Sequence, residues 1–297
     1  MAKVLILGSN GLLGQNLVKK FISGNQIIAA SIEDESFISG LKVDYHPIDL
    51  SKRRETREFI EKVSPEIIIN AAAYTDVDKC EDDPQTCWAA NVRAVENILE
   101  GAKNLKPVFV QISTDYVFNG QTPPYGEKHP PDPISVYGRS KLAAENIIKS
   151  CPFEYQIIRT QILFGNGARI RKNFVTWVIE QLQQGNKINV VDDQAGSPTY
   201  APDLCEAISR LLEKEAFGLF HVSSESSVSR FEFANLIAEV FNLDKSLLHE
   251  INTNQLKQKA PRPKNSTFKI DKLVNYSGWQ PHSLEDALKL LKKEMMS

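Results

Sequence analysis

Residues 4–14 read Val4-Leu-Ile-Leu7-Gly8-Ser-Asn-Gly11-Leu-Leu-Gly14, and this stretch decides the fold. The apolar run from Val4 to Leu7, bounded by glycine, predicts a short buried strand. From Leu12 to Ile22 the apolar side chains recur at helical spacing, which predicts a helix. A strand, a glycine turn and a helix in this order are typical of the first unit of a parallel α/β sheet.

The glycine spacing, Gly8-x-x-Gly11-x-x-Gly14, is a variant of the G-x-G-x-x-G pattern found where a dinucleotide binds. The first glycine permits a tight turn, the second lets the backbone approach a pyrophosphate, and the third permits close helix packing. The pyrophosphate would accept hydrogen bonds from free N–H groups at the amino terminus of the helix. The alternative is an ordinary turn with three glycines, but the strand and helix around it favour a dinucleotide site.

Further apolar runs predict strands, and the segments between them predict helices. The predicted strands are residues 26–30, 66–70, 107–113 and 156–159, and the predicted helices are residues 57–63, 87–102, 136–149, 173–184, 201–213, 230–241 and 283–295. Apolar strands that alternate with helices indicate a parallel sheet covered on both faces. We therefore predict an α/β fold, a Rossmann-like doubly wound parallel sheet with a smaller α/β substrate-binding lobe. The Rossmann lobe would comprise residues 1–165 plus about 188–222, and the smaller lobe about 166–187 plus 223–297.

Composition restricts the partners of the chain. With 35 Lys and Arg against 37 Asp and Glu, the net charge is −2, which provides no broad basic field for nucleic acid or an anionic membrane. No stretch approaches the roughly 18 apolar residues of a membrane span, and no signal-peptide core is visible. The sequence thus predicts a cytoplasmic protein that binds a small molecule, with no nucleic-acid or membrane partner.

The cysteines and histidines show no spacing typical of a metal site or a disulfide framework. The four cysteines (Cys80, Cys87, Cys151 and Cys205) form no C-x-x-C pair, so we expect reduced packing residues. The five histidines stand singly, and we expect no dedicated transition-metal site.

Tyr137 is the only one of the eight tyrosines that is followed four residues later by a lysine, Lys141. On a helix these positions share a face, so the ammonium can lower the pKa of the phenol. A shift from about 10 to about 7 requires about 4 kcal/mol, which a cation at about 4 Å supplies in an effective dielectric near 20. Tyr137 could then protonate a carbonyl oxygen during hydride transfer from a nicotinamide, while the hydroxyl of Thr114 orients that oxygen.

At this point the chain resembles the dTDP-4-dehydrorhamnose reductases, a branch of the extended short-chain dehydrogenases/reductases. The resemblance rests on motifs that span most of the chain: Gly8-Ser-Asn-Gly-Leu-Leu-Gly14, Asn70-Ala-Ala-Ala-Tyr-Thr-Asp-Val-Asp-Lys79, Ser113-Thr-Asp-Tyr-Val-Phe118, Tyr137-Gly-Arg-Ser-Lys141, Asp193-Gln-Ala-Gly-Ser-Pro-Thr199 and Arg262-Pro263. The motifs that begin at Ser113 and Asp193 are far more specific than the glycine turn.

The resemblance implies a role for each motif. Thr114, Tyr137 and Lys141 would form the catalytic triad, with Lys141 also bonding the nicotinamide ribose. The cofactor would contact Gly8, Asn10, Gly11, Leu12, Leu13, Gly14, Ser31, Asp49, Leu50, Ala71, Ala72 and Ala73 as well as Tyr137 and Lys141. The substrate sugar would face Thr75, Val77, Asp115 and Tyr116, and its diphosphate would meet Arg262, whose guanidinium fork suits phosphate oxygens.

Plainer interpretations of some of these residues stay open. Asp76, Asp78 and Lys79 could be solvated loop charges, Tyr116 and Phe118 could be core aromatics, and Arg262 could be a surface cation. The cofactor is also open, because Ser31 and Ile32 end the second strand while Glu33 and Asp34 follow late for a ribose hydroxyl. The sequence predicts NADPH, slightly favoured, or NADH.

Two positions depart from the pattern of the family. Many members have a serine and then a tryptophan where this chain has Gln161 and Ile162, so an aromatic wall of the substrate site is missing. Some bacterial members hold magnesium at a dimer interface with a glutamate where this chain has Asn16. We therefore expect no metal and no magnesium-bridged dimer, while a homodimer of another kind stays open.

The resemblance implies an NAD(P)H-dependent enzyme that reduces the 4-keto group of a dTDP-6-deoxy-hexulose, converting dTDP-4-dehydrorhamnose to dTDP-L-rhamnose. The first alternative is a non-catalytic, NADP-binding regulatory subunit resembling the beta subunit of methionine adenosyltransferase, which keeps a similar triad and also lacks the tryptophan. The second is a reductase or epimerase of another nucleotide sugar.

Overall fold

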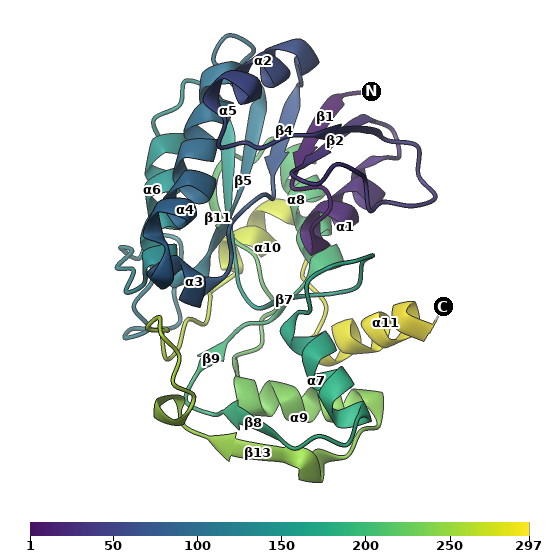
Figure 1. Cartoon of the computed structure of the whole chain (residues 1–297), viewed down its shortest axis with the longest axis vertical. Coiled ribbons are helices and arrows are strands. Elements are labelled where there is room, and N and C mark those ends of the chain that lie inside the picture. Colours follow the sequence, from purple (N-terminus) through teal and green to yellow (C-terminus); the bar gives the residue numbers. More distant parts are fainter. Residues whose placement is uncertain (297) are drawn as a thin grey trace.

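A seven-stranded parallel sheet forms the upper lobe in the view of Figure 1, and its strand order is β11-β6-β5-β4-β1-β2-β3. The structure is a computed structural model and describes residues 1–296. The strands are β1 (Lys3–Leu7), β2 (Gln26–Ser31), β3 (Asp44–Pro47), β4 (Ile67–Asn70), β5 (Val108–Thr114), β6 (Tyr155–Thr160) and β11 (Gly218–His221). The chain moves outward from β1 in both directions, so the expected Rossmann-like doubly wound sheet is confirmed.

Helices cover both faces of this sheet (Figure 1). One face carries α2 (Arg53–Val63), α5 (Ala94–Ala102) and α6 (Val136–Ile148), and the other carries α1 (Leu12–Phe21), α8 (Ala201–Glu213) and α10 (Asp271–Ser277). Successive side chains of β1 alternate between the two cores: Val4 and Ile6 join the α1 and α8 side, and Leu5 and Leu7 join the α2 and α5 side. Burial on both faces explains why the first strand is apolar without alternation.

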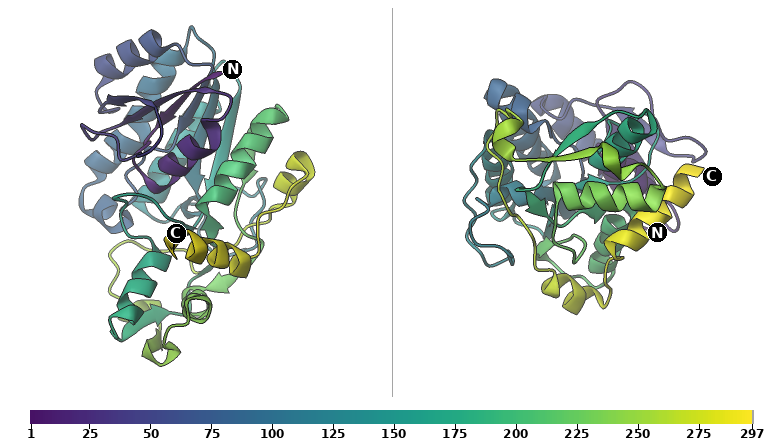
Figure 2. Two further views of the ribbon diagram at one scale, coloured as in Figure 1. Left: turned by 90° about the vertical axis from the view of Figure 1, so that its right-hand side faces the viewer. Right: turned by 90° about the horizontal axis from the view of Figure 1, so that it is seen from below.

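The smaller lobe has a hydrophobic core of its own and lies below the sheet in Figure 1. It contains α7 (Phe174–Gln183), α9 (Arg230–Phe241) and α11 (Leu284–Met296), together with the parallel strands β8 (Ile188–Val191) and β13 (Leu248–Ile251). Figure 2 shows α9 and α11 lying against one another in the views from the side and from below.

In the structure, strand β8 packs in the smaller lobe, although the sequence-based boundary places its residues in the Rossmann lobe. The sequence-based boundary assigns residues 188–222 to the Rossmann lobe, but β8 pairs with β13, and Ile188 and Val190 join the core of the smaller lobe. We propose that the chain returns to the Rossmann lobe after β8.

The remaining elements are short. They are α3 (Val77–Asp82), α4 (Pro84–Trp88), a π-helical turn (Ala89–Arg93), the 3-10 turns Asp115–Val117, Lys245–Leu247 and Thr253–Gln255, and the paired strands β7 (Leu163–Phe164) with β10 (Thr199–Tyr200) and β9 (Ala195–Gly196) with β12 (Val228–Ser229). The helix predicted over 87–102 is therefore divided into α4, the π-helical turn and α5.

All four cysteines are free, and three of them are buried, which confirms the packing role expected for those three. Within residues 1–296 no helix is both long and apolar enough to cross a membrane.

Candidate active site

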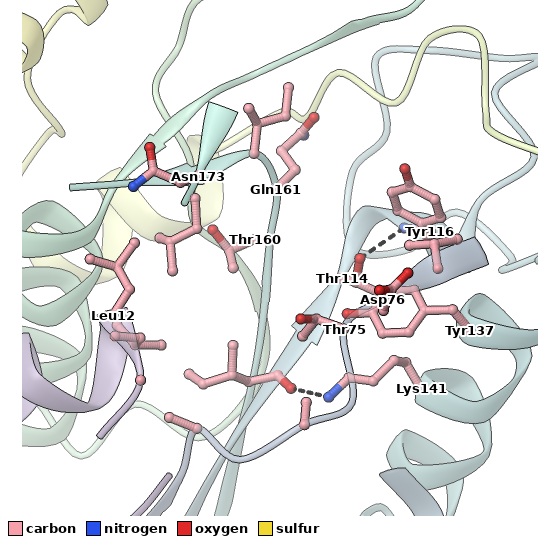
Figure 3. Close-up of a pocket in the computed structure, with 18 of the residues that line it drawn as sticks. Leu12, Thr75, Asp76, Thr114, Tyr116, Tyr137, Lys141, Thr160, Gln161 and Asn173 are labelled. Carbon is pink, nitrogen blue, oxygen red and sulfur yellow. Dashed lines mark hydrogen bonds between the residues drawn. The ribbon is translucent and has the colours of Figure 1, made fainter. Parts of the chain in front are cut away.

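A pocket of about 660 Å³ opens at the carboxyl ends of β1, β4, β5 and β6 (Figure 3). In open α/β sheets ligands bind at this edge, where the strand order reverses. Here the reversal lies between β1 and β4. The lining residues are Gly11 to Gly14, Ala71 to Ala73, Thr75 to Asp78, Ile112 to Tyr116, Tyr137, Lys141, Thr160 to Leu163, Ile170 to Asn173 and Arg262.

The glycine turn forms one wall of this pocket. Gly8 has a φ of +76°, and a Cβ on Gly14 would lie 2.1 Å from the Gly8 carbonyl oxygen, so both positions require glycine for backbone geometry. A Cβ on Gly11 would contact only that same oxygen, at 3.4 Å, and would otherwise project into open space. Gly11 caps α1 with no side-chain hydrogen bond, and the first N–H groups of α1 have no carbonyl of a preceding turn as acceptor. These residues fit a pyrophosphate of a dinucleotide.

Two alanine substitutions should separate the roles of these glycines. We expect Gly14→Ala to destabilise the protein by about 1–3 kcal/mol, because the new methyl group overlaps the Gly8 carbonyl. We expect Gly11→Ala to leave the thermal midpoint nearly unchanged but to weaken cofactor binding, because its methyl group would occupy the space beside the helix terminus. Thermal melting and NADPH fluorescence titration of both variants measure the two effects. Equal loss of stability in both variants would contradict this division.

The predicted cofactor residues divide into those that line the pocket and those that do not. Gly11, Leu12, Leu13, Gly14, Ala71, Ala72, Ala73, Tyr137 and Lys141 line it, whereas Gly8, Asn10, Ser31, Asp49 and Leu50 do not. Their contact with a cofactor stays a prediction. In the structure Asp49, one of the second group, accepts hydrogen bonds from the backbone N–H and the hydroxyl of Ser51.

Asn10 links the glycine turn to the loop that follows β2. Its backbone N–H donates to Ser31 Oγ at 3.0 Å, and its side chain donates to Glu33 Oε2 at 3.1 Å and accepts from the Phe37 N–H at 2.9 Å. The Glu33 carboxylate is thereby held beside the end of β2. An acid at this place can bond a ribose hydroxyl and repels a 2′-phosphate.

Tyr137 and Lys141 project from α6 toward Thr114, the last residue of β5 (Figure 3). The helix begins after Ser135, whose Oγ accepts from the Gly138 N–H at 3.1 Å. A Cβ on Gly138 would lie 2.1 Å from the Tyr116 carbonyl oxygen, so this glycine lets α6 approach the end of β5. The three expected catalytic residues therefore meet in one pocket, with Tyr137 and Lys141 both buried.

The Lys141 ammonium is buried and donates to the Ile112 carbonyl oxygen at 2.7 Å. Burial lowers the pKa of Lys141 to about 8, and the negative charge of Glu145, one helical turn further on, opposes this shift. Lys141 is therefore charged at neutral pH, but its titration lies close to the physiological range.

The Tyr137 phenol differs from the sequence-based expectation. Burial raises its pKa, with a further increase from the Asp115 charge, and a hydrogen bond with Thr114 opposes these effects only in part. The expected net lowering by Lys141 is therefore wrong for this structure, because desolvation dominates. A raised pKa keeps the proton on the phenol at neutral pH, which is the form that a general acid requires.

The residues expected to face the substrate occupy the other end of the pocket. Thr75, Val77, Asp115, Tyr116 and Arg262 all line it. Tyr116 packs edge-on against Tyr137 with ring centroids 5.7 Å apart, so it borders the site. Phe118, in contrast, is a core aromatic, fully buried and stacked on Tyr125.

Asp115 is a buried carboxylate beside the residues expected to be catalytic. It accepts hydrogen bonds from Thr114 Oγ1 at 3.1 Å and from Ser266 Oγ at 2.5 Å. Burial raises its pKa, and these hydrogen bonds oppose the shift. Ser266 comes from the chain segment after β13, so this hydrogen bond links that segment to the end of β5.

Arg262 is not a surface cation, since only 11% of its side chain is exposed. Its guanidinium holds Asp78 with two hydrogen bonds of 2.6 and 2.8 Å. Asp78 is therefore not a solvated loop charge, and neither is Asp76, which accepts from Arg171 at 3.1 Å. Lys79, with 67% of its side chain exposed, does fit that plainer interpretation.

Several lining residues were absent from the expected site. Thr160 and the loop residues Ile170 to Asn173 belong to this group. The loop has no periodic pattern, although Asn173 carries the capping-box signature of the next helix. Ile162, at the position where the sequence departs from the expected family pattern, lines the pocket with a φ of +44°, a strained value for a β-branched residue.

Several known proteins are similar to this chain in sequence or in structure. "Spore coat polysaccharide biosynthesis protein SpsK" of Bacillus subtilis is 33% identical over 300 residues, covering 100% of this chain and 99% of that protein. Methionine adenosyltransferase 2 subunit beta of Danio rerio is 30% identical and covers 91% of this chain and 84% of its own. A crystal structure of dTDP-4-dehydrorhamnose reductase from Bacillus anthracis in complex with NADP has a TM-score of 0.86 and 32% identity, covering 99% of both chains.

The model of one protein family matches almost the whole chain. This family, described as the RmlD substrate binding domain, matches residues 2–297. The expected branch of the extended short-chain dehydrogenases/reductases is thereby confirmed, together with the expected oxidoreductase class. The chain belongs to the RmlD substrate binding domain family.

Proposed function

We propose that this protein is an NAD(P)H-dependent reductase of the 4-keto group of a dTDP-6-deoxy-hexulose, forming dTDP-L-rhamnose from dTDP-4-dehydrorhamnose. One observation carries the proposal: a buried, protonated Tyr137 lies in the same pocket as Thr114, Lys141 and the glycine turn. This arrangement places a proton donor beside a site that fits a dinucleotide. The relationship to a dTDP-4-dehydrorhamnose reductase at 32% identity supports the choice of substrate.

Each group of pocket residues would have its own role in the reaction. The amino terminus of α1 and residues 71–73 would hold a nicotinamide cofactor, which supplies the hydride. Tyr137 would donate its proton to the sugar oxygen, and Thr114 would orient that oxygen through a hydrogen bond. Lys141 would bond the cofactor ribose, and its positive charge would stabilise the phenolate that Tyr137 becomes.

The choice of cofactor is part of the proposal. NADPH is the first candidate, because the related structure from Bacillus anthracis contains NADP. NADH is the second, because Asn10 holds the Glu33 carboxylate near the end of β2. The rates of NADPH and NADH oxidation, each measured with the sugar nucleotide present, rank the two cofactors.

The proposal predicts that purified protein oxidises NADPH or NADH when dTDP-4-dehydrorhamnose is supplied. Absorbance at 340 nm measures the rate, and omission of the sugar nucleotide is the control. No oxidation with any 4-keto sugar nucleotide, in a preparation that still binds the cofactor, would refute the proposal. Activity only with another nucleotide sugar would keep the reductase and change its substrate.

A regulatory subunit is the second candidate function. The 30% identity to methionine adenosyltransferase 2 subunit beta favours it, as does Ile162 at the place of the missing tryptophan. Co-expression with a methionine adenosyltransferase catalytic subunit followed by size-exclusion chromatography tests this candidate. Separate elution of the two chains would refute it.

A further inference from the structure

Residues 166–172, which connect β7 to α7, lie at the edge of the candidate site, and we call this segment the strap. It contains no helix or strand, and every residue in it is exposed or half-buried. In Figure 1 it is the teal loop between β7 and α7, below α1. Ile170, Arg171 and Lys172 of the strap line the same pocket as the glycine turn.

Gln15 of α1 anchors one end of the strap beside the glycine turn. Its Nε2 donates to the Ala168 carbonyl oxygen at 2.8 Å, and its Oε1 accepts from the Ala168 N–H at 2.8 Å. The same Nε2 donates to the Asn10 carbonyl oxygen at 2.7 Å. Only 2% of Gln15 is exposed, so this end of the strap is held by a buried, hydrogen-bonded side chain.

Two arginines connect the rest of the strap to loops on different strands. Arg169 pairs with Glu35, in the connection that follows β2, and its guanidinium lies over the Phe37 ring at 5.3 Å. Arg171 Nη2 donates to Asp76 Oδ2 at 3.1 Å, in the connection that follows β4. The sheet order places β2 and β4 on opposite sides of β1. The strap therefore joins both sides of the edge at which a dinucleotide would bind.

The two ion pairs are of a kind that opens readily. The side chains of Arg169 and Glu35 are 65% and 70% exposed, and exposed ion pairs stabilise a structure only slightly. Arg169 also has a φ of +53°, a costly value for a residue with a side chain, which an open strap would relax. Segments with few buried contacts open locally without unfolding the whole protein. The strap meets these conditions beyond its anchor at Gln15.

We propose that residues 166–172 close over a bound nicotinamide dinucleotide, and that the ion pairs with Glu35 and Asp76 set how fast this cofactor enters and leaves. Both pairs are formed in the structure, so the strap must release them each time a cofactor passes. They hold the strap alike before and after binding, and they therefore affect both rates without changing the affinity. This inference rests on the proposed function only in taking the ligand to be a nicotinamide dinucleotide.

The same segment offers a matched control. Lys172 pairs with Glu180 at 2.6 Å, but Glu180 belongs to α7, the helix that follows the strap. This pair holds the strap to its own next helix and does not connect it to the loops after β2 or β4. Neither Glu35 nor Glu180 lines the pocket. Substitution of either by glutamine therefore removes one carboxylate from an ion pair of the strap without changing the pocket wall.

Stopped-flow fluorescence of NADPH and NADH measures the association rate, and a chase with excess oxidised cofactor measures the dissociation rate. We expect Glu35→Gln to raise both rate constants by about two- to fivefold, the range for one exposed ion pair, with the dissociation constant nearly unchanged. Arg169→Gln and the double variant should show the same factor, because each breaks the same pair. Glu180→Gln should match wild type.

Trypsin provides a second measurement, which needs no cofactor. It cleaves after arginine and lysine, and Glu35→Gln keeps all three such residues of the strap: Arg169, Arg171 and Lys172. We expect faster cleavage at these sites in Glu35→Gln than in wild type or Glu180→Gln, and slower cleavage in each protein when NADPH or NADH is bound. Mass spectrometry identifies the bonds that are cut.

A change in the dissociation rate alone would overturn the inference, because the ion pair would then act on the bound cofactor and not on its passage. Equal rates or equal cleavage in Glu35→Gln and wild type would also overturn it, as would the same acceleration in Glu180→Gln. If neither cofactor binds, the inference and the proposed reaction both fail. If both rates rise as expected but no 4-keto sugar nucleotide is reduced, only the reaction is refuted.

Discussion

Substitution of Tyr137 by phenylalanine is expected to lower kcat by about 10²–10⁴-fold, because it removes the proposed proton donor and leaves the ring in place. The phenol is buried beside Thr114, and its raised pKa keeps it protonated before the reaction. Stopped-flow or steady-state oxidation of NADPH measures the loss. Cofactor affinity, followed by fluorescence, should change little, because the glycine turn, where we propose that the cofactor binds, is untouched.

Tyr116→Phe is the matched control for this prediction. Its ring packs against Tyr137 with the ring centroids 5.7 Å apart, and it lines the same pocket, so it is an alternative proton donor. We expect this variant to raise KM more than it lowers kcat, because it alters the part of the pocket proposed to hold the substrate. If Tyr116→Phe abolished turnover while Tyr137→Phe remained active, the roles of the two tyrosines would have to be exchanged.

The sequence predicts the centre of the fold because its signals there are local. The run from Val4 to Leu7 is buried on both faces, and Gly8 and Gly14 are required by backbone geometry, so both features leave a mark in the local sequence. Strands β3 and β11 escaped prediction because they lie at the two edges of the sheet. An edge strand pairs on one side only and can carry polar residues such as Asp44 and His46.

In the candidate site too, the sequence predicts only those features whose signal is local. Tyr137 and Lys141 lie four residues apart, so their spacing alone brings them to one face of α6. The pairing of Asp78 with Arg262 joins residues 184 positions apart, and no local pattern indicates it. The pKa of Tyr137 was predicted with the wrong sign for a related reason, because burial depends on the whole pocket and a pairwise estimate with Lys141 omits it.

Glu145→Gln is expected to destabilise the protein by about 3–5 kcal/mol, because it leaves the buried charge of Arg159 without its partner. Glu145 and Arg159 are 0% and 1% exposed, and they form two hydrogen bonds of 2.8 and 2.6 Å. Ser113 Oγ also donates to Glu145 at 2.6 Å, so the substitution disturbs a connected network. Thermal or urea unfolding measures the loss. The double variant Glu145→Gln with Arg159→Met should recover most of it, because no unpaired charge remains.

The exposed pair of Arg54 and Glu58 provides the contrast, and Glu58→Gln should leave the melting temperature unchanged.

Glu145 also affects the active site, because its charge raises the pKa of Lys141, one turn earlier on α6. Lys141 is charged below its pKa, so loss of Glu145 should move the alkaline limb of the rate profile from about pH 8 to lower pH. The double variant isolates this effect, since it restores stability without restoring the carboxylate. An unchanged alkaline limb in a folded double variant would show that Glu145 serves stability alone.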